Sequence, residues 1–197
     1  MEVFSDPIPD QSKFVYKKTK KIAEIQKNLK KLFSAFNKVV KKYDVTYCLD
    51  SGTLLGAVRH GNIIPWDDDI DVQMYKEDIK VLLKNRKEIR DMGYHIGFRD
   101  KIYRFERMRK DRKYGSDGYI DIFEVRERNG RIEYTEAWNR ERWPKYWYRK
   151  SEREPLILYK FGRIKVMGPK NPYPYLKRAY GKWNKGVIWE THHEVDE

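Results

Sequence analysis

Hydrophobic residues near the start of the chain recur with the spacing of an amphipathic helix. Between Lys17 and Tyr43 they fall on one side of such a helix, and lysines fill the other side. The apolar positions are Ile22, Ile25, Leu29, Leu32, Phe33, Phe36 and Val40. The pattern favours a helix that packs on a core and exposes a basic face, the alternative being a helix lying on anionic lipid. Residues 1–12 before it contain two prolines and are predicted to be extended.

The pattern then changes to short apolar runs separated by turn residues. Val45–Leu49 predicts a buried strand, Ser51-Gly52-Thr53 a turn that opens a short helix, and Ile70–Met74 a second strand. Residues two apart in a strand share a face, so the side chains of Asp69, Asp71 and Gln73 are expected to point the same way.

The remaining pattern predicts strands and helices in one α/β (α+β) domain with a mixed sheet flanked by helices. The expected elements are a helix over Lys76–Asp91, strands over Tyr94–Phe98, Ile102–Met108 and Tyr119–Phe123, hairpins through Asn129-Gly130 and Gly162, and a last helix between Asn171 and Gly181. We expect residues 1–197 to form a single domain and residues 190–197 to be a flexible tail.

Two adjacent carboxylates on one strand face repel each other unless a cation or a shared proton relieves them. Asp69 and Asp71 are such a pair, and Mg²⁺ or Mn²⁺ takes carboxylate oxygens and commonly bridges to phosphates. A glycine turn that begins a helix offers backbone N–H groups to an anion. This combination is typical of phosphoryl or nucleotidyl transfer, although an aspartate cluster is also a common solvated turn.

Asp121 is an isolated carboxylate in the apolar strand Tyr119–Phe123. Burying it is costly unless it is paired or binds a metal, which favours a third carboxylate beside Asp69 and Asp71. The alternative is an edge strand with Asp121 facing water. Arg104, in the strand before it, is a candidate phosphate-binding group, but it could equally be an ordinary exposed arginine.

The residues Ser51 to His60, with the sequence SGTLLGAVRH, and Ile64 to Asp71, with the sequence IPWDDDID, resemble the signature of the LicD family. Asp121, flanked by isoleucines before Phe123, resembles its second motif, although Glu124-Val125-Arg126 departs from the Pro-Leu-Asp that often follows. The resemblance implies a nucleotidyltransferase-like fold. It also implies metal-dependent transfer of a phospho-alcohol, such as phosphocholine or ribitol phosphate, from a CDP-linked donor to a glycan.

On this resemblance Asp69, Asp71 and Asp121 are the expected catalytic and metal-binding residues, with Asp121 binding metal or accepting a proton. The donor phosphate is expected at Ser51, Gly52 and Thr53. Arg59, His60 and Arg104 complete the expected substrate-binding set, Arg59 as a cation that neutralises developing charge, while His60 is as readily structural.

The formal charge of +13 adds anionic partners to this picture. A CDP-linked donor and a glycan acceptor are the expected partners, with peripheral contact to an anionic membrane as an addition. Two alternatives are a nucleotidyltransferase acting on nucleic acid or a small molecule, and a non-catalytic module that binds RNA or lipid. The single cysteine and the lack of any long apolar run predict a cytoplasmic protein.

Overall fold

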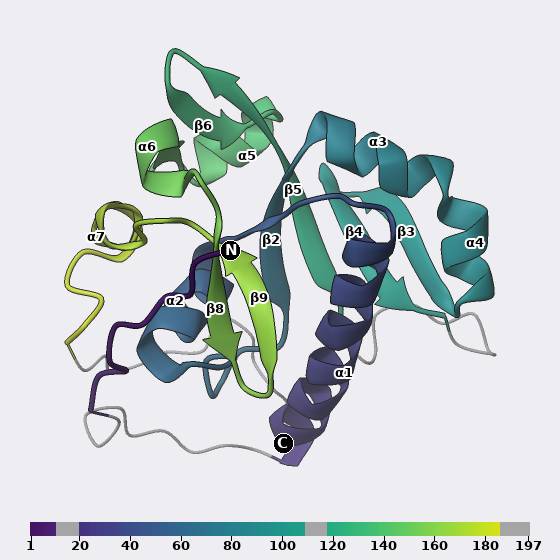
Figure 1. Cartoon of the computed structure of the whole chain (residues 1–197), viewed down its shortest axis with the longest axis horizontal. Coiled ribbons are helices and arrows are strands. Elements are labelled where there is room, and N and C mark those ends of the chain that lie inside the picture. Colours follow the sequence, from purple (N-terminus) through teal and green to yellow (C-terminus); the bar gives the residue numbers. More distant parts are fainter. Residues whose placement is uncertain (11–19, 109–117, 186–197) are drawn as a thin grey trace.

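A mixed sheet flanked by helices forms the centre of the computed structural model, which describes residues 1–10, 20–108 and 118–185 (Figure 1). Its strands run in the order β1 (Cys48–Leu49), β2 (Ile70–Tyr75), β5 (Ile120–Arg128), β4 (Ile102–Arg107) and β3 (Tyr94–Arg99). β2 and β5 are parallel, whereas the other neighbours are antiparallel. The predicted fold class is therefore confirmed.

Shorter elements extend this sheet and cover it. β6 (Arg131–Tyr134) pairs with β5, β7 (Tyr148–Arg149) pairs with β6, and β8 (Ile157–Phe161) forms a separate hairpin with β9 (Ile164–Gly168). The helices are α1 (Lys20–Lys42), α2 (Ser51–His60), α3 (Lys76–Lys84), α4 (Arg86–Asp91), α5 (Ala137–Arg142), α6 (Lys150–Arg153) and α7 (Tyr173–Tyr180).

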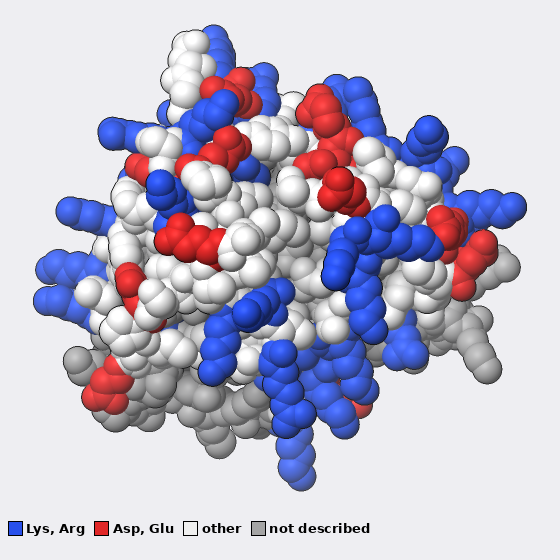
Figure 2. Space-filling model, in the orientation of Figure 1, with Lys and Arg blue, Asp and Glu red and all other residues white. Residues whose placement is uncertain are grey.

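The helix α1 buries its apolar side, as the hydrophobic spacing predicts. Phe33 and Phe36 are fully buried and contact the rings of Phe161 and Phe105, which joins α1 to both sheets. The lysines of α1 are exposed, and Lys and Arg gather along this helix on the face shown in Figure 2. Burial of the apolar stripe is therefore what holds α1 in place.

The predicted helix over Lys76–Asp91 is two helices, and the prediction of one element is wrong. Asn85, between α3 and α4, has φ −97° and ψ 15°, and its side chain donates to the carbonyl of Val81. Asparagine competes for backbone hydrogen bonds in this way and so favours helix ends over helix interiors.

The predicted strand over Val45–Leu49 is also shorter than expected. Only Cys48 and Leu49 pair with β2, while the Val45 N–H donates to the carbonyl of Val40 and closes the end of α1. Asp44 there adopts a φ of +50°, which turns the chain before the strand begins.

The predicted hairpins and the last helix are confirmed. Asn129 and Gly130 have positive φ in the turn between β5 and β6, Gly162 has positive φ between β8 and β9, and α7 ends at Gly181. Residues 1–10 form no helix or strand of the sheets, and Val3 bridges to Leu158; residues 11 and 12 of the predicted lead-in lie outside the described residues. The predicted tail, 190–197, lies outside the described residues, among which no helix is long and apolar enough to span a membrane.

Gly56 in α2 offers a test of this packing. A Cβ there would lie 2.5 Å from the carbonyl oxygen of Asn62 and 3.1 Å from the amide nitrogen of Ile64. Gly-to-Ala changes inside helices usually stabilise by about 1 kcal/mol. Gly56→Ala should instead destabilise the protein by about 1–3 kcal/mol, because the backbone must shift, and thermal unfolding would measure this.

Gly52→Ala in the same helix is the matched control. The one close contact of its Cβ would be with a carboxylate oxygen of Asp67, at 2.9 Å, and that side chain can move aside. An unchanged melting temperature for Gly56→Ala would contradict the packing of α2 against the 62–64 segment.

Candidate active site

Three carboxylates from two neighbouring strands meet at one end of the sheet. Asp71 pairs directly with Asp121 in the parallel register of β2 and β5, and Asp69 lies just before β2. One oxygen atom from each of the three lies within 4.8 Å of the others. The structure thus brings together the three aspartates that the sequence predicts as a metal site, including Asp121, which comes about 50 residues later in the chain.

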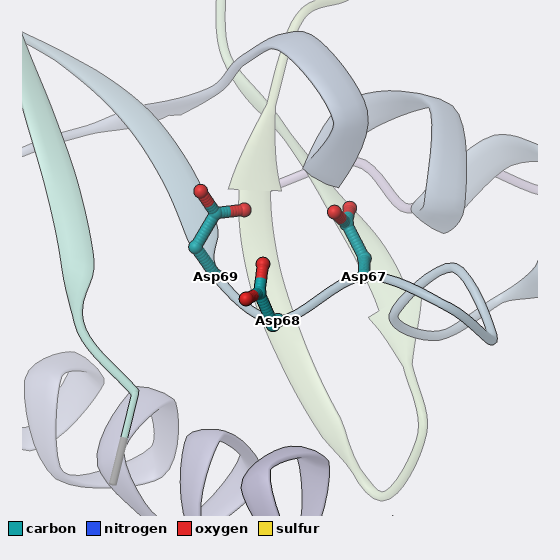
Figure 3. A group of neighbouring side chains, drawn as sticks. All are labelled: Asp67, Asp68 and Asp69. Atoms are coloured by element: carbon teal, nitrogen blue, oxygen red, sulfur yellow. The ribbon is translucent and has the colours of Figure 1, made fainter. Parts of the chain in front are cut away.

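A second group overlaps the first. Oxygen atoms of Asp67, Asp68 and Asp69 also lie within 4.8 Å of one another, and Figure 3 shows these carboxylates on the same side of the segment that leads into β2. Asp67 also approaches the start of α2. Its carboxylate occupies the space that a side chain at Gly52 would need. Asp69 belongs to both groups and joins them.

The charges in this cluster oppose one another. Burial raises the pKa of Asp71, and the neighbouring Asp69 and Asp121 raise it further. Burial likewise raises the pKa of Asp69, followed by the effects of Asp67 and Asp121. The pKa of Asp67 rises to about 7 because of burial and the adjacent Asp68. An isolated cluster of this kind holds its protons more tightly than free aspartate does.

Asp121 is buried and also has a partner within the protein, so it does not face water from an edge strand. The Nε of Arg104 donates to its Oδ1 at 2.8 Å, because Arg104 and Asp121 are paired across β4 and β5. Arg104 also lies over the ring of Tyr119, 4.4 Å from its centroid. Burial raises the pKa of Asp121, whereas the hydrogen bond from Arg104 lowers it. One cation therefore compensates part of the negative charge.

The donor set suits a hard divalent cation. Asp69, Asp71 and Asp121 supply only carboxylate oxygens, the ligands that Mg²⁺ and Mn²⁺ prefer, and these oxygens converge on one small volume. Within the described part of the chain, Arg104 is the guanidinium paired with these three carboxylates, and one such group leaves most of their charge uncompensated. The residues present therefore fit a metal, which would polarise a phosphate oxygen and neutralise charge that develops on it.

The predicted glycine turn lies beside the carboxylates and begins α2, as expected. Two of its polar groups are already used within the protein: the Ser51 N–H donates to the hydroxyl of Tyr175 at 3.2 Å, and the Thr53 Oγ1 accepts from the Asp71 N–H at 2.8 Å. The N–H groups of Gly52 and Thr53 belong to the first helical turn and have no acceptor within the helix. These two groups are the better candidates for phosphate.

Arg59 and His60 lie at the far end of α2. Arg59 is almost fully buried, donates through Nε to the Nε2 of His60 at 2.9 Å, and lies over the ring of Trp66. Burial lowers the pKa of His60 to about 4, so its imidazole is neutral. The attraction between Arg59 and Asp67 makes Arg59 part of the electrostatic surroundings of the cluster, and His60 acts by holding Arg59.

The sequence prediction omits two groups that the structure places at the site. Asp67 reads as a turn residue next to Pro65 and Trp66, yet it contacts the start of α2. Asp50 precedes the glycine turn and is fully buried, accepting hydrogen bonds from Tyr134 and Tyr175. The only sequence signal for Asp50 is a charged residue directly after an apolar strand, which does not distinguish it from a surface residue.

This fold and its cluster of carboxylates fit a nucleotidyltransferase-like domain. The profile of the family described as "LicD/FKTN/FKRP, nucleotidyltransferase domain" matches residues 44–171, which include the glycine turn and all three aspartates. The chain belongs to this family, and the resemblance seen in the sequence is confirmed.

Individual relatives show where the similarity is concentrated. An uncharacterized protein of Rickettsia prowazekii is 33% identical over 168 residues, covering 84% of this chain and 59% of its own length. Lipopolysaccharide cholinephosphotransferase LicD of Haemophilus influenzae is 49% identical over 43 residues, which is 22% of this chain and 16% of LicD. Human ribitol 5-phosphate transferase FKRP is 54% identical over 41 residues, 21% of this chain and 8% of FKRP. The chain thus spans only part of each of these relatives, about three fifths in the case of the Rickettsia prowazekii protein.

Metal binding should stabilise the folded protein. A ligand at about 100 times its dissociation constant adds about 2.7 kcal/mol, so saturating Mg²⁺ should raise the melting temperature by about 5–10 °C. Asp71→Asn should remove most of this increase. Without metal, Asp71→Asn should melt no lower than the wild type, because one repelling charge is gone. Thermal melts with Mg²⁺ and with EDTA measure both effects.

Asp121→Asn provides the matched comparison. It also removes a carboxylate, but it takes from Arg104 its buried charged partner and leaves only the exposed Asp100, 3.9 Å away, so its metal-free form should melt below that of Asp71→Asn. An identical wild-type melting temperature in Mg²⁺ and in EDTA would contradict a metal site.

Proposed function

We propose that the protein transfers a phospho-alcohol or a sugar phosphate from a CDP-linked donor to a hydroxyl of a glycan, with Mg²⁺ or Mn²⁺. The observation that supports this most is the convergence of Asp69, Asp71 and Asp121 beside a helix that begins with a glycine turn. Family membership supports transferase activity, and the names of the LicD and FKRP relatives supply the two candidate groups, phosphocholine and ribitol phosphate.

Each part of the site has a task in this reaction. Asp69, Asp71 and Asp121 would hold the metal, and the N–H groups of Gly52 and Thr53 would hold a donor phosphate at the start of α2. The metal would supply charge neutralisation at the pyrophosphate. This arrangement would orient the donor so that its outer phosphorus is open to the acceptor hydroxyl.

Asp121 fits the role of ligand better than that of general base. Arg104 donates to it at 2.8 Å and so favours its ionised form. The same bond holds the carboxylate in a fixed position beside Asp69 and Asp71, as a metal ligand requires. We therefore assign Asp121 to the metal and Arg104 to the support of Asp121, in place of a direct contact between Arg104 and substrate.

The bond that breaks separates this function from its closest alternative. When the acceptor hydroxyl attacks the outer phosphorus of a CDP-linked donor, the bond between that phosphorus and the oxygen bridging the two phosphates breaks. CMP is then released. A nucleotidyltransferase with the same carboxylates would attack the inner phosphorus and leave CMP on the acceptor. The two outcomes are distinguished by the mass added to the acceptor.

The test is turnover of CDP-choline and CDP-ribitol with a glycan acceptor, followed by mass spectrometry. We expect one of the donors to release CMP in Mg²⁺ and not in EDTA. Asp71→Asn should lower the rate by at least about a hundredfold, since even residues that only support metal ligands often have effects of up to that size.

Asp91→Asn, an exposed aspartate at the end of α4, is the control and should keep the wild-type rate. Gain of a nucleotide by the acceptor would establish the alternative activity. Turnover that persists in EDTA, or that survives Asp71→Asn, would overturn the proposed site.

A further inference from the structure

Asp50 is a fully buried carboxylate that the reaction described above does not use. It lies directly between β1 and α2, and its two oxygens accept hydrogen bonds from different tyrosines. Tyr134 of β6 donates to Oδ2 at 2.7 Å, and Tyr175 of α7 donates to Oδ1. The two tyrosines come 84 and 125 residues later in the chain, so three distant segments meet at this carboxylate.

The tyrosine hydroxyls are themselves held in place by packing. The ring of Tyr175 stacks on that of Tyr148 with centroids 4.2 Å apart, and the Tyr148 hydroxyl donates to the carbonyl of Leu49 at 3.1 Å. Tyr134 stacks on Phe123 with centroids 4.8 Å apart. Asp50 thus meets two donors whose positions are fixed by the core, and it holds the end of β1 between them.

The adjacent Ser51 has a backbone conformation that needs such support. Its φ is +45°, in the left-handed region that is unfavourable for residues other than glycine. The Tyr175 hydroxyl that donates to Asp50 also accepts the Ser51 N–H at 3.2 Å. One tyrosine therefore fixes both the carboxylate and the first N–H of the turn.

The same turn is connected to a carboxylate of the site. The Asp50 N–H donates to the carbonyl of Asp71 at 3.2 Å, and the Asp71 N–H donates to the Thr53 Oγ1 at 2.8 Å. These two bonds join the chain on both sides of Gly52 to the backbone of β2. Any shift of Asp50 is thereby passed to Gly52, whose N–H faces the proposed phosphate.

We propose that Asp50 is a positioning residue: held by Tyr134 and Tyr175, it fixes the Ser51–Thr53 turn in the conformation that binds the donor phosphate beside Asp71. The inference rests on the proposed function, because it takes the turn to be the phosphate site. A carboxylate suits the position because, when ionised, it only accepts hydrogen bonds, and both tyrosine hydroxyls donate to it. An amide at this position would direct two N–H donors at one of the hydroxyls.

The test compares Asp50→Asn, Tyr134→Phe and Tyr175→Phe with Tyr159→Phe. Tyr159 is the matched control because it is also fully buried and donates to a backbone carbonyl, that of Pro169, at 2.6 Å within another part of the fold. Two quantities are measured for each protein: hydrogen exchange at the amides of residues 51–53, and the affinity for CDP in Mg²⁺ by calorimetry. Thermal melts record the loss of stability in each case.

We expect faster exchange at residues 51–53 and CDP binding weakened by about tenfold or more in the three variants, as loss of a bond to a charged group implies. In a turnover assay the donor KM should rise by the same factor while kcat stays within about threefold, because the turn contributes uniform binding. Tyr159→Phe should change neither the exchange at residues 51–53 nor the affinity for CDP, even if its melting temperature falls as much as that of the other variants.

Other outcomes separate the possible failures. Loss of CDP affinity that follows melting temperature in all four variants would overturn the proposal and make Asp50 purely structural. Unchanged exchange at residues 51–53 in Asp50→Asn would also overturn it. If wild-type protein binds no CDP in Mg²⁺ while exchange changes as expected, the proposed function fails but the control of the turn by Asp50 stands.

Discussion

Repulsion among carboxylates is the constraint on which the rest of this structure depends. Asp69, Asp71 and Asp121 come within 4.8 Å of one another because β2 and β5 pair in parallel with Asp71 opposite Asp121. The core fixes that register, since Ile70, Val72, Ile120 and Ile122 are fully buried on the two strands. A one-residue slip would move the aspartates to the other face and the isoleucines and valine out of the core. Apolar packing thus imposes an arrangement that electrostatics opposes.

The protein meets this opposition with several partial solutions. Arg104 compensates Asp121, and the hydroxyls of Tyr134 and Tyr175 donate hydrogen bonds to the buried carboxylate of Asp50. None of these neutralises Asp69 and Asp71 together. In our account the remaining charge is what gives the site its affinity for a divalent cation, and the glycine turn places a phosphate next to that cation.

The local sequence predicts much of this site because its parts are local. The glycine turn, the helix after it and the alternation of Ile70, Asp71 and Val72 all come from one stretch of chain, and the isoleucines around Asp121 mark it as a buried strand. The pairing of Asp121 with Arg104 depends on β4 register, which periodicity does not specify. The Asp50 contacts with Tyr134 and Tyr175 join segments more than 80 residues apart and follow from tertiary packing alone. The break at Asn85 was missed because helical hydrophobic spacing continues through it.

The central claim is that Asp69, Asp71 and Asp121 oppose folding when ionised together without metal. The most direct measurement is the free energy of unfolding between pH 4 and pH 7 in EDTA, compared with the triple variant Asp69→Asn, Asp71→Asn, Asp121→Asn.

A carboxylate whose folded pKa lies above its unfolded pKa stabilises the fold below the unfolded pKa and loses that contribution as pH rises through the folded pKa. The pKa values of all three are raised, so wild-type stability should fall relative to the triple variant as pH rises, and Mg²⁺ should reverse the fall. The opposing effect of His60, whose pKa is lowered to about 4, is common to both proteins and cancels. Wild-type stability that rises relative to the triple variant over this range, or that does not respond to Mg²⁺, would contradict the account.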